Sequence, residues 1–221
     1  MNEPLTPQSE MTETELGFRL ETILAAHDFG DDGSHDIHHL RRVRNLALQI
    51  AAIEGAGDPL VLTAAAYLHD IVNLPKDHRE RHLASQFASE AAGPMLHKAG
   101  LDADRIAQAQ HAILTHSYSA GFRPETIEAK IIQDADRQEA IGAIGIARAF
   151  YVAGRMGSAL FDPEDPLAER RALDDKRFAL DHFAVKLFAL PDLMQTRGGR
   201  ALAEERVTFM RSFVDQLLRE L

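Results

Sequence analysis

Apolar residues recur at helical spacing along most of the chain. Thr12 and Glu15 fit a capping box, and the apolar positions from Leu16 to Leu24 repeat with the period of one helix face. Strict alternation of apolar and polar residues, the pattern of a half-buried strand, is not convincing anywhere. The pattern therefore predicts an all-α chain, with helices at about 12–29, 36–54, 58–68, 82–98, 102–116, 125–150, 174–190 and 199–221.

Caps and helix breakers place several of these ends. Gly55 and Gly57 follow the second predicted helix, whose start Asp36 is expected to cap or brace. Asp58 and Pro59 then open an almost wholly apolar segment, which predicts a buried helix. No repeat or linker demands two independent domains. The expected organisation is a flexible N-terminus at 1–10 and a single domain at 11–221, with a core at about 20–157 and a C-terminal helical extension at about 158–221.

Composition narrows the possible functions. The 221 residues include 24 lysines and arginines against 34 aspartates and glutamates, and the net charge of -10 disfavours a nucleic-acid polymer or a membrane as partner. A local basic pocket for a small phosphorylated ligand remains compatible with that charge. The absence of cysteine excludes disulfides and thiolate chemistry. Because neither a signal peptide nor a bilayer-spanning stretch is evident, we expect a cytoplasmic protein.

The first candidate chemistry is a histidine-aspartate pair at the end of the buried helix. His69 and Asp70 follow the apolar run directly, and unpaired burial of an aspartate costs several kcal/mol. A metal ion, a nearby cation or a hydrogen-bond network would offset that cost. An isolated His-Asp dipeptide is nevertheless common by chance, and a capped helix end facing solvent would explain it equally well.

Two further segments favour a metal site. His39 lies four residues before Val43, on the face of the second predicted helix that should meet the core. Asp134 and Asp136 come directly after apolar residues in a later helix. Three helices can therefore each offer a ligand to one centre.

With these segments the chain resembles the HD-domain metal-dependent phosphohydrolase superfamily, and more closely its YedJ/YpgQ-like bacterial subfamily. Residues 173–183 extend the likeness into the C-terminal part. The resemblance implies an all-α HD-domain helical fold with additional C-terminal helices. An Ala-Asp-Arg match favours Asp136 over Asp134, whereas Gln138 departs from the leucine that relatives usually carry. The implied ligands of a single divalent metal are His39, His69, Asp70 and Asp136.

This ligand set has a defined chemical preference. Two imidazoles and two carboxylates suit a transition metal better than magnesium or calcium. Manganese is the favoured ion, and nickel, cobalt, iron, zinc or magnesium are alternatives. Four protein ligands on an octahedral ion leave two positions, one for water and one for a phosphoryl oxygen. Asp70 is expected to orient or deprotonate that water, a role that the superfamily often gives to this residue.

Cationic groups are needed to hold a phosphate beside the metal. Lys76 and Arg81 follow the His-Asp pair in a polar loop, and Arg42 and Arg137 are rivals that could instead neutralise nearby carboxylates. His116 is expected at the pocket rim, where it could protonate a leaving group. The predicted catalytic residues are Asp70, His116 and Lys76, and the predicted substrate-binding residues are Lys76, Arg42, Arg81, His116 and Arg137.

The expected function is hydrolysis of a phosphoester or phosphoanhydride bond by metal-activated water. A nucleotide is the favoured substrate, and this preference comes from the resemblance alone. One alternative is a metal-binding nucleotide sensor with little turnover, and another is a two-iron oxygenase. The stretch of small residues at 142–157 suits either intrachain packing or a dimer seam, so we expect a monomer or a homodimer.

Overall fold

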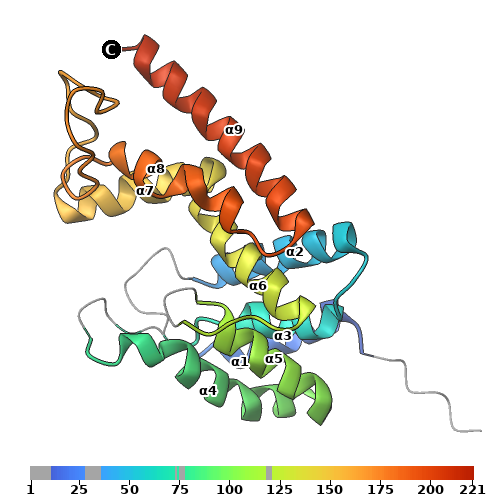
Figure 1. Cartoon of the computed structure of the whole chain (residues 1–221). Helices are drawn as coiled ribbons and strands as arrows, with labels where there is room; N and C mark the ends of the chain where they lie inside the picture. The colour runs from blue at the N-terminus through green and yellow to red at the C-terminus, as the bar shows by residue number, and fades with distance from the viewer. Residues whose placement is uncertain (1–10, 28–35, 73, 75–77, 118–120) are drawn as a thin grey trace, which may run out of the picture.

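The computed structural model describes residues 11–27, 36–72, 74, 78–117 and 121–221, and their regular structure is helical (Figure 1). One isolated parallel bridge, between Ala159 and Phe178, adds to the helices. The all-α prediction is confirmed. The α-helices are α1 (Glu13–Leu24), α2 (Ile37–Glu54), α3 (Pro59–Leu68), α4 (Ala84–Ala99), α5 (Ala103–Thr115), α6 (Ile127–Arg137), α7 (Gly142–Met156), α8 (Asp181–Val185) and α9 (Arg197–Arg219), and the 3-10 turns are η1 (Arg81–Leu83), η3 (Gln138–Ala140) and η4 (Leu187–Leu193).

Local side chains explain how the first helices start and stop. The hydroxyl of Thr12 accepts a hydrogen bond from the backbone N–H of Glu15 at 3.2 Å, so the predicted cap of α1 is present. Asp36 caps α2 and Asp58 caps α3 in the same way. Gly55 ends α2 with φ of 66°, a left-handed conformation that costs glycine little.

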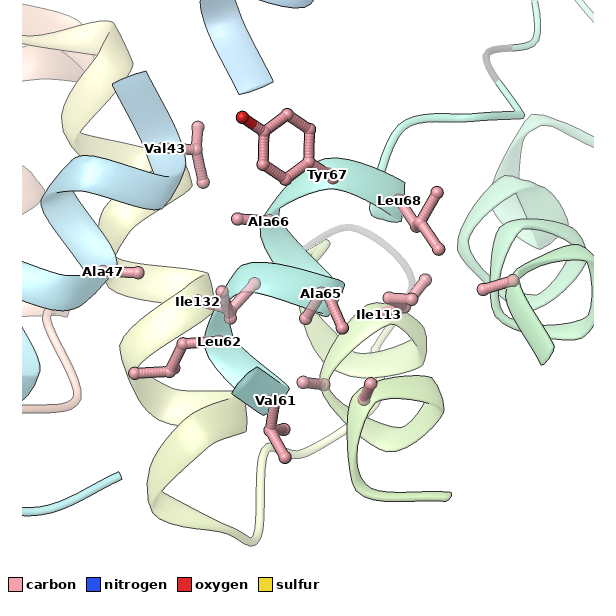
Figure 2. Packing of buried hydrophobic residues seen from close by; sticks show 14 of the residues in the cluster. Val43, Ala47, Val61, Leu62, Ala65, Ala66, Tyr67, Leu68, Ile113 and Ile132 are labelled. Atoms are coloured by element: carbon pink, nitrogen blue, oxygen red, sulfur yellow. The ribbon is translucent and has the colours of Figure 1, made fainter. Parts of the chain in front are cut away.

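Helix α3 is the centre of the first hydrophobic cluster, which is built from α1 to α6. Every residue from 61 to 68 is buried. Figure 2 shows α3 lying between Val43 and Ala47 of α2 on one side and Ile113 of α5 on the other. Burying a large aliphatic side chain contributes roughly 1.5–3 kcal/mol, so this helix is firmly fixed. Its C-terminal end consequently holds His69 inside the protein.

The predicted continuous helix at 125–150 is wrong. Helix α6 ends at Arg137, the turn η3 follows, and α7 begins at Gly142 with φ of 76°. The chain folds back so tightly here that a Cβ on Gly145 would collide with the carbonyl oxygen of Ala140. Helix propensity alone favours a continuous helix. The two glycines permit the break.

The predicted helix at 174–190 is also wrong. Residues 175–180 form turns together with the bridge at Phe178, and only α8 and the turn η4 follow. The buried carboxylate of Asp181 accepts hydrogen bonds from Arg171 and from the backbone N–H of Asp174, which favours the turns over a helix. The last helix begins two residues before the predicted position, because Thr196 caps it by accepting from the N–H of Gly199 at 2.9 Å.

A second hydrophobic cluster joins α7, α8, η4 and α9 around Phe183 and Met210. In Figure 1 these elements lie on one side of α2 and α6, with α1, α3, α4 and α5 on the other. The organisation as a single domain at 11–221 remains a prediction, and the expected flexible segment 1–10 lies outside the described residues. No helix in the described ranges has both the length and the apolar character needed to cross a membrane.

Candidate metal centre

Four helix ends bring histidines and carboxylates together. His39 lies in the first turn of α2, where its backbone N–H donates to the capping carboxylate of Asp36 at 2.9 Å. His69 follows α3, His116 follows α5, and Asp136 is the penultimate residue of α6. The three histidines are buried. The site is therefore built on rigid elements packed against the first hydrophobic cluster.

The reactive atoms lie close to one another. The Nε2 atoms of His39 and His69 are 3.2 Å apart. Asp70 Oδ2 lies 3.7 Å from His39 Nε2 and 3.5 Å from His69 Nε2. Asp136 Oδ1 lies 3.6 Å and 3.7 Å from the same two nitrogens. The structure thus brings the four predicted metal ligands into one cluster.

Hydrogen bonds at the opposite ring edge define which imidazole nitrogens are available. His69 Nδ1 lies 2.9 Å from the carbonyl oxygen of Ala66, and His116 Nδ1 lies 2.7 Å from that of Ile113. Because a carbonyl oxygen can only accept, both Nδ1 atoms donate, and Nε2 is unprotonated in the neutral rings. His39 Nδ1 faces the carboxylate of Glu139 at 3.3 Å, which assigns the same tautomer. Two unprotonated nitrogens 3.2 Å apart would repel each other, so either a proton or a metal ion between them is needed to stabilise this arrangement.

The electrostatics of the site agree with that requirement. Burial lowers the pKa of His39, but hydrogen bonding to Asp70 and Glu139 and the charge of Asp136 outweigh burial and raise this pKa to about 9. Burial raises the pKa of Asp70, yet His69 and the neighbouring histidines hold it well below its usual value. The carboxylates therefore strongly favour positive charge among the rings, which a divalent metal would supply in place of protons.

Asp134, the alternative to Asp136, faces another part of the molecule. Its Oδ2 accepts hydrogen bonds from the N–H of Thr196 at 2.8 Å and from the hydroxyl of Thr196 at 2.7 Å. Its Oδ1 accepts from the N–H of Gln195 at 2.8 Å. Asp134 therefore attaches α6 to the start of α9, and Asp136 is the member of the pair that lies beside the histidines.

A cavity of about 520 Å³ opens beside the cluster, and a second of about 410 Å³ shares Ala140, Arg148 and Lys186 with it. Neither the guanidinium of Arg148 nor the ammonium of Lys186 forms an ion pair or hydrogen bond with any part of the chain that the structure describes. These two cations are available to a ligand. The first cavity is lined by Asp70, His116, Ser117, Asp136, Arg137, Ala140, Arg148, Lys186, Leu190 and Leu193.

The remaining predicted site residues have different positions. His116 and Arg137 line the first cavity, and Arg137 also donates to the carbonyl oxygen of Leu193. Arg42 forms an ion pair with Glu139 at 2.8 Å. Arg81 is exposed and donates to the carbonyl oxygen of Leu74. The predicted role of Lys76 lies outside the described residues.

Three residues of interest were missing from the sequence-based prediction. Glu139 follows Asp136 by three positions, and this helical spacing is a signal that could have found it. Arg148 and Lys186 carry no local motif. They reach the cavity because α7 and α8 fold back toward the cluster of histidines and carboxylates, and the sequence pattern does not show this packing.

Comparison with known proteins agrees with this geometry. A family model described as the HD domain matches residues 36–141, which include the four clustered side chains. The protein YpgQ of Bacillus subtilis is 36% identical over 195 residues, covering 86% of each chain. Its crystal structure in complex with ADP has a TM-score of 0.71 at 33% identity and covers 96% of this chain and 97% of that one. An HD-superfamily hydrolase from Bacillus thuringiensis has a TM-score of 0.72 at 30% identity, covering 95% and 98%.

Proposed function

The chain belongs to the HD-domain family and is homologous to YpgQ, and from this premise we propose that it is a metal-dependent phosphohydrolase acting on a nucleotide. The observation that supports this most is the convergence of histidine Nε2 atoms and carboxylates beside a cavity that also contains Arg148 and Lys186, two cations with no ion pair among the described residues. The cluster suits a metal, and the cations suit a phosphate.

The donor set fits one divalent transition metal. We assign its ligands as His39, His69, Asp70 and Asp136, two nitrogen and two oxygen donors, with manganese favoured over nickel, cobalt, iron, zinc or magnesium. When bound, such an ion lowers the pKa of a coordinated water and polarises a phosphoryl oxygen. Residues of the chain would then position the substrate and move the protons.

Asp70 is placed to accept the proton of the attacking water. Its Oδ2 faces His39 and His69, whereas its Oδ1 lies 3.5 Å from His116 Nε2. The water oxygen forms the new bond to phosphorus while its proton passes to Asp70. His116 starts as the imidazolium, because burial, which lowers its pKa, is outweighed by hydrogen bonding to Asp70, which raises its pKa. The P–O bond to the leaving group breaks, and the imidazolium gives that oxygen its Nε2 proton. Transfer of the proton from Asp70 to His116 restores both groups.

The two adjoining cavities support a nucleotide as substrate. Their volumes of about 520 and 410 Å³ are within the usual range for small-molecule sites. Arg137, Arg148 and Lys186 can pair with phosphate oxygens on the way from the first cavity to the second. The second cavity also has an apolar wall, made by Ala149, Val152 and Met156, that suits a nucleobase. YpgQ, which covers nearly the whole chain, forms a complex with ADP.

A release assay tests this proposal. Phosphate and pyrophosphate release would be measured from nucleoside mono-, di- and triphosphates with Mn²⁺, Co²⁺, Ni²⁺ and Mg²⁺. We expect hydrolysis of at least one nucleotide class. The rate of release should be more than about 100-fold lower in Asp70→Asn. Asp192→Asn, which removes an exposed carboxylate elsewhere, is the matched control and should keep full activity. Nucleotide binding without product would contradict the hydrolase and favour the sensor.

A further inference from the structure

Glu139 is a buried carboxylate next to the cluster of histidines and carboxylates. The proposed hydrolytic mechanism does not use it. Only 1% of the residue is exposed. Its Oε2 lies 3.3 Å from His39 Nδ1 and accepts a hydrogen bond from Arg42 Nε at 2.8 Å. Arg42 Nη2 lies 2.8 Å from the same oxygen. This oxygen therefore connects an imidazole of the cluster to a guanidinium at the surface.

We infer that Glu139 and Arg42 are positioning residues that hold His39 ready for the metal. Glu139 accepts a hydrogen bond from Nδ1 of His39, which fixes the ring orientation and directs Nε2 toward His69 and the carboxylates of the site. Arg42 pairs with the Glu139 carboxylate and offsets the cost of burying it. Arg42 thus acts on the metal site through Glu139. This inference rests on the proposed metal site at His39.

The backbone arrangement makes this network specific. His39 and Arg42 are three residues apart on α2, so their side chains lie on one face of that helix. Glu139 reaches that face from η3, the turn that interrupts the helical run between α6 and α7. Arg206 of α9 donates to the carbonyl oxygen of Gln138 at 2.7 Å and holds this turn in place. The C-terminal helix therefore supports the position of Glu139.

The same contacts distinguish a positioning role for Arg42 from a role in binding substrate. The Arg42 guanidinium is already paired with Glu139, and Arg42 is not among the described residues that line either cavity beside the site. A residue that contacts phosphate should change KM. A residue that positions His39 should change the affinity for the metal itself.

Titration calorimetry with MnCl₂ on the full-length protein, stripped of metal, tests the inference. Loss of an outer partner of a metal-binding histidine typically weakens metal affinity by 10–100-fold. We expect Kd for Mn²⁺ to rise toward 100-fold in Glu139→Ala. The rise should be about 10-fold in Glu139→Gln, because glutamine at position 139 can still accept from Nδ1, and about 10-fold in Arg42→Gln, because Glu139 itself remains. Arg41→Gln is the matched control, because Arg41 is adjacent on α2 and pairs with Glu21 instead.

Two further readouts separate positioning from simple loss of structure. Thermal unfolding followed by circular dichroism identifies variants that have not folded. Nitrogen-proton correlation spectra of the imidazoles should show the Nδ1–H tautomer of His39 in the parent protein and its loss in Glu139→Ala. At saturating Mn²⁺, Arg42→Gln should keep KM for the nucleotide within about twofold, as a positioning role requires.

The outcomes are distinguishable. Binding of Mn²⁺ by the parent protein and equally tight binding by folded Glu139→Ala would overturn the inference and leave the proposed metal site intact. A raised KM in Arg42→Gln with unchanged metal affinity would assign Arg42 to substrate and also overturn it. No Mn²⁺ binding by the parent protein, with His69→Ala indistinguishable from it, would remove the metal site itself.

Discussion

At the scale of single residues, the site depends on which ring nitrogen each histidine presents. His39, His69 and His116 all direct Nδ1 to an acceptor and Nε2 to the cluster. The sequence was sufficient to name His39 and His69 as candidate ligands, because both stand in segments that resemble the HD-domain family. It was insufficient for Arg148 and Lys186, because their position at the cavity depends on how elements far apart in the chain pack together.

Substitution of the two available cations should weaken substrate binding. We expect Arg148→Ala and Lys186→Ala each to raise KM for the nucleotide by about tenfold or more, since a hydrogen bond to a charged group contributes roughly 1.5–3 kcal/mol. The affinity for Mn²⁺ should not change. Steady-state kinetics measures the first and calorimetry the second. Lys98→Ala, on the exposed face of α4, is the control, and an unchanged KM in both cavity variants would refute their assignment.

At the scale of elements, helix starts with a cap recognised in the sequence were predictable and helix interruptions were not. Thr12, Asp58 and Asp102 cap their helices through contacts within a few residues, so the local sequence contains the signal. The break after Arg137 depends on packing between distant segments, including Arg206 of α9 against η3. The different roles of Asp134 and Asp136 have the same origin. Asp134 accepts hydrogen bonds from the residues that lead into α9, whereas Asp136 lies beside the histidines.

The link between α6 and α9 should be structural and independent of the metal. We expect Asp134→Ala to lower the free energy of unfolding by about 2 kcal/mol, because the N–H groups of Gln195 and Thr196 lose a buried acceptor. Metal affinity at Asp136 should stay within a few-fold of the parent value. Urea unfolding and calorimetry provide the two measurements. Unchanged stability, or loss of metal binding in a fully stable variant, would contradict this account.

An ion pair between α1 and α2 should make stability depend on pH in the acid range. Hydrogen bonding to Arg41 lowers the pKa of Glu21 from 4.5 to about 2, and the Tyr67 hydroxyl also donates to Glu21. The stabilisation is therefore present above pH 4.5 and is lost as pH falls toward 2. Because Arg41 is largely exposed, we expect this ion pair to contribute at most about 1 kcal/mol to the free energy of unfolding.

Urea unfolding of the parent protein and Glu21→Gln between pH 6 and 3 measures this contribution. The difference in unfolding free energy between the two proteins should shrink as the pH is lowered. A constant difference over that range would show that the pair does not titrate as described.

At the scale of the whole molecule, the chemistry lies where two hydrophobic clusters meet. The first cluster, built from α1 to α6, fixes the proposed metal ligands, and the second, built around α7 to α9, supplies Arg148 and Lys186. The all-α class and the family followed from local pattern and motif. The cavity did not, because its shape depends on how the C-terminal elements pack against the rest.

Metal analysis of the purified protein and its Asp136→Ala variant tests the central claim most directly. The account predicts about one transition-metal ion per chain in the parent protein and a large loss in the variant, with unchanged helicity by circular dichroism. Equal metal content in both proteins, or none in the parent protein after incubation with Mn²⁺ and desalting, would contradict the assigned centre.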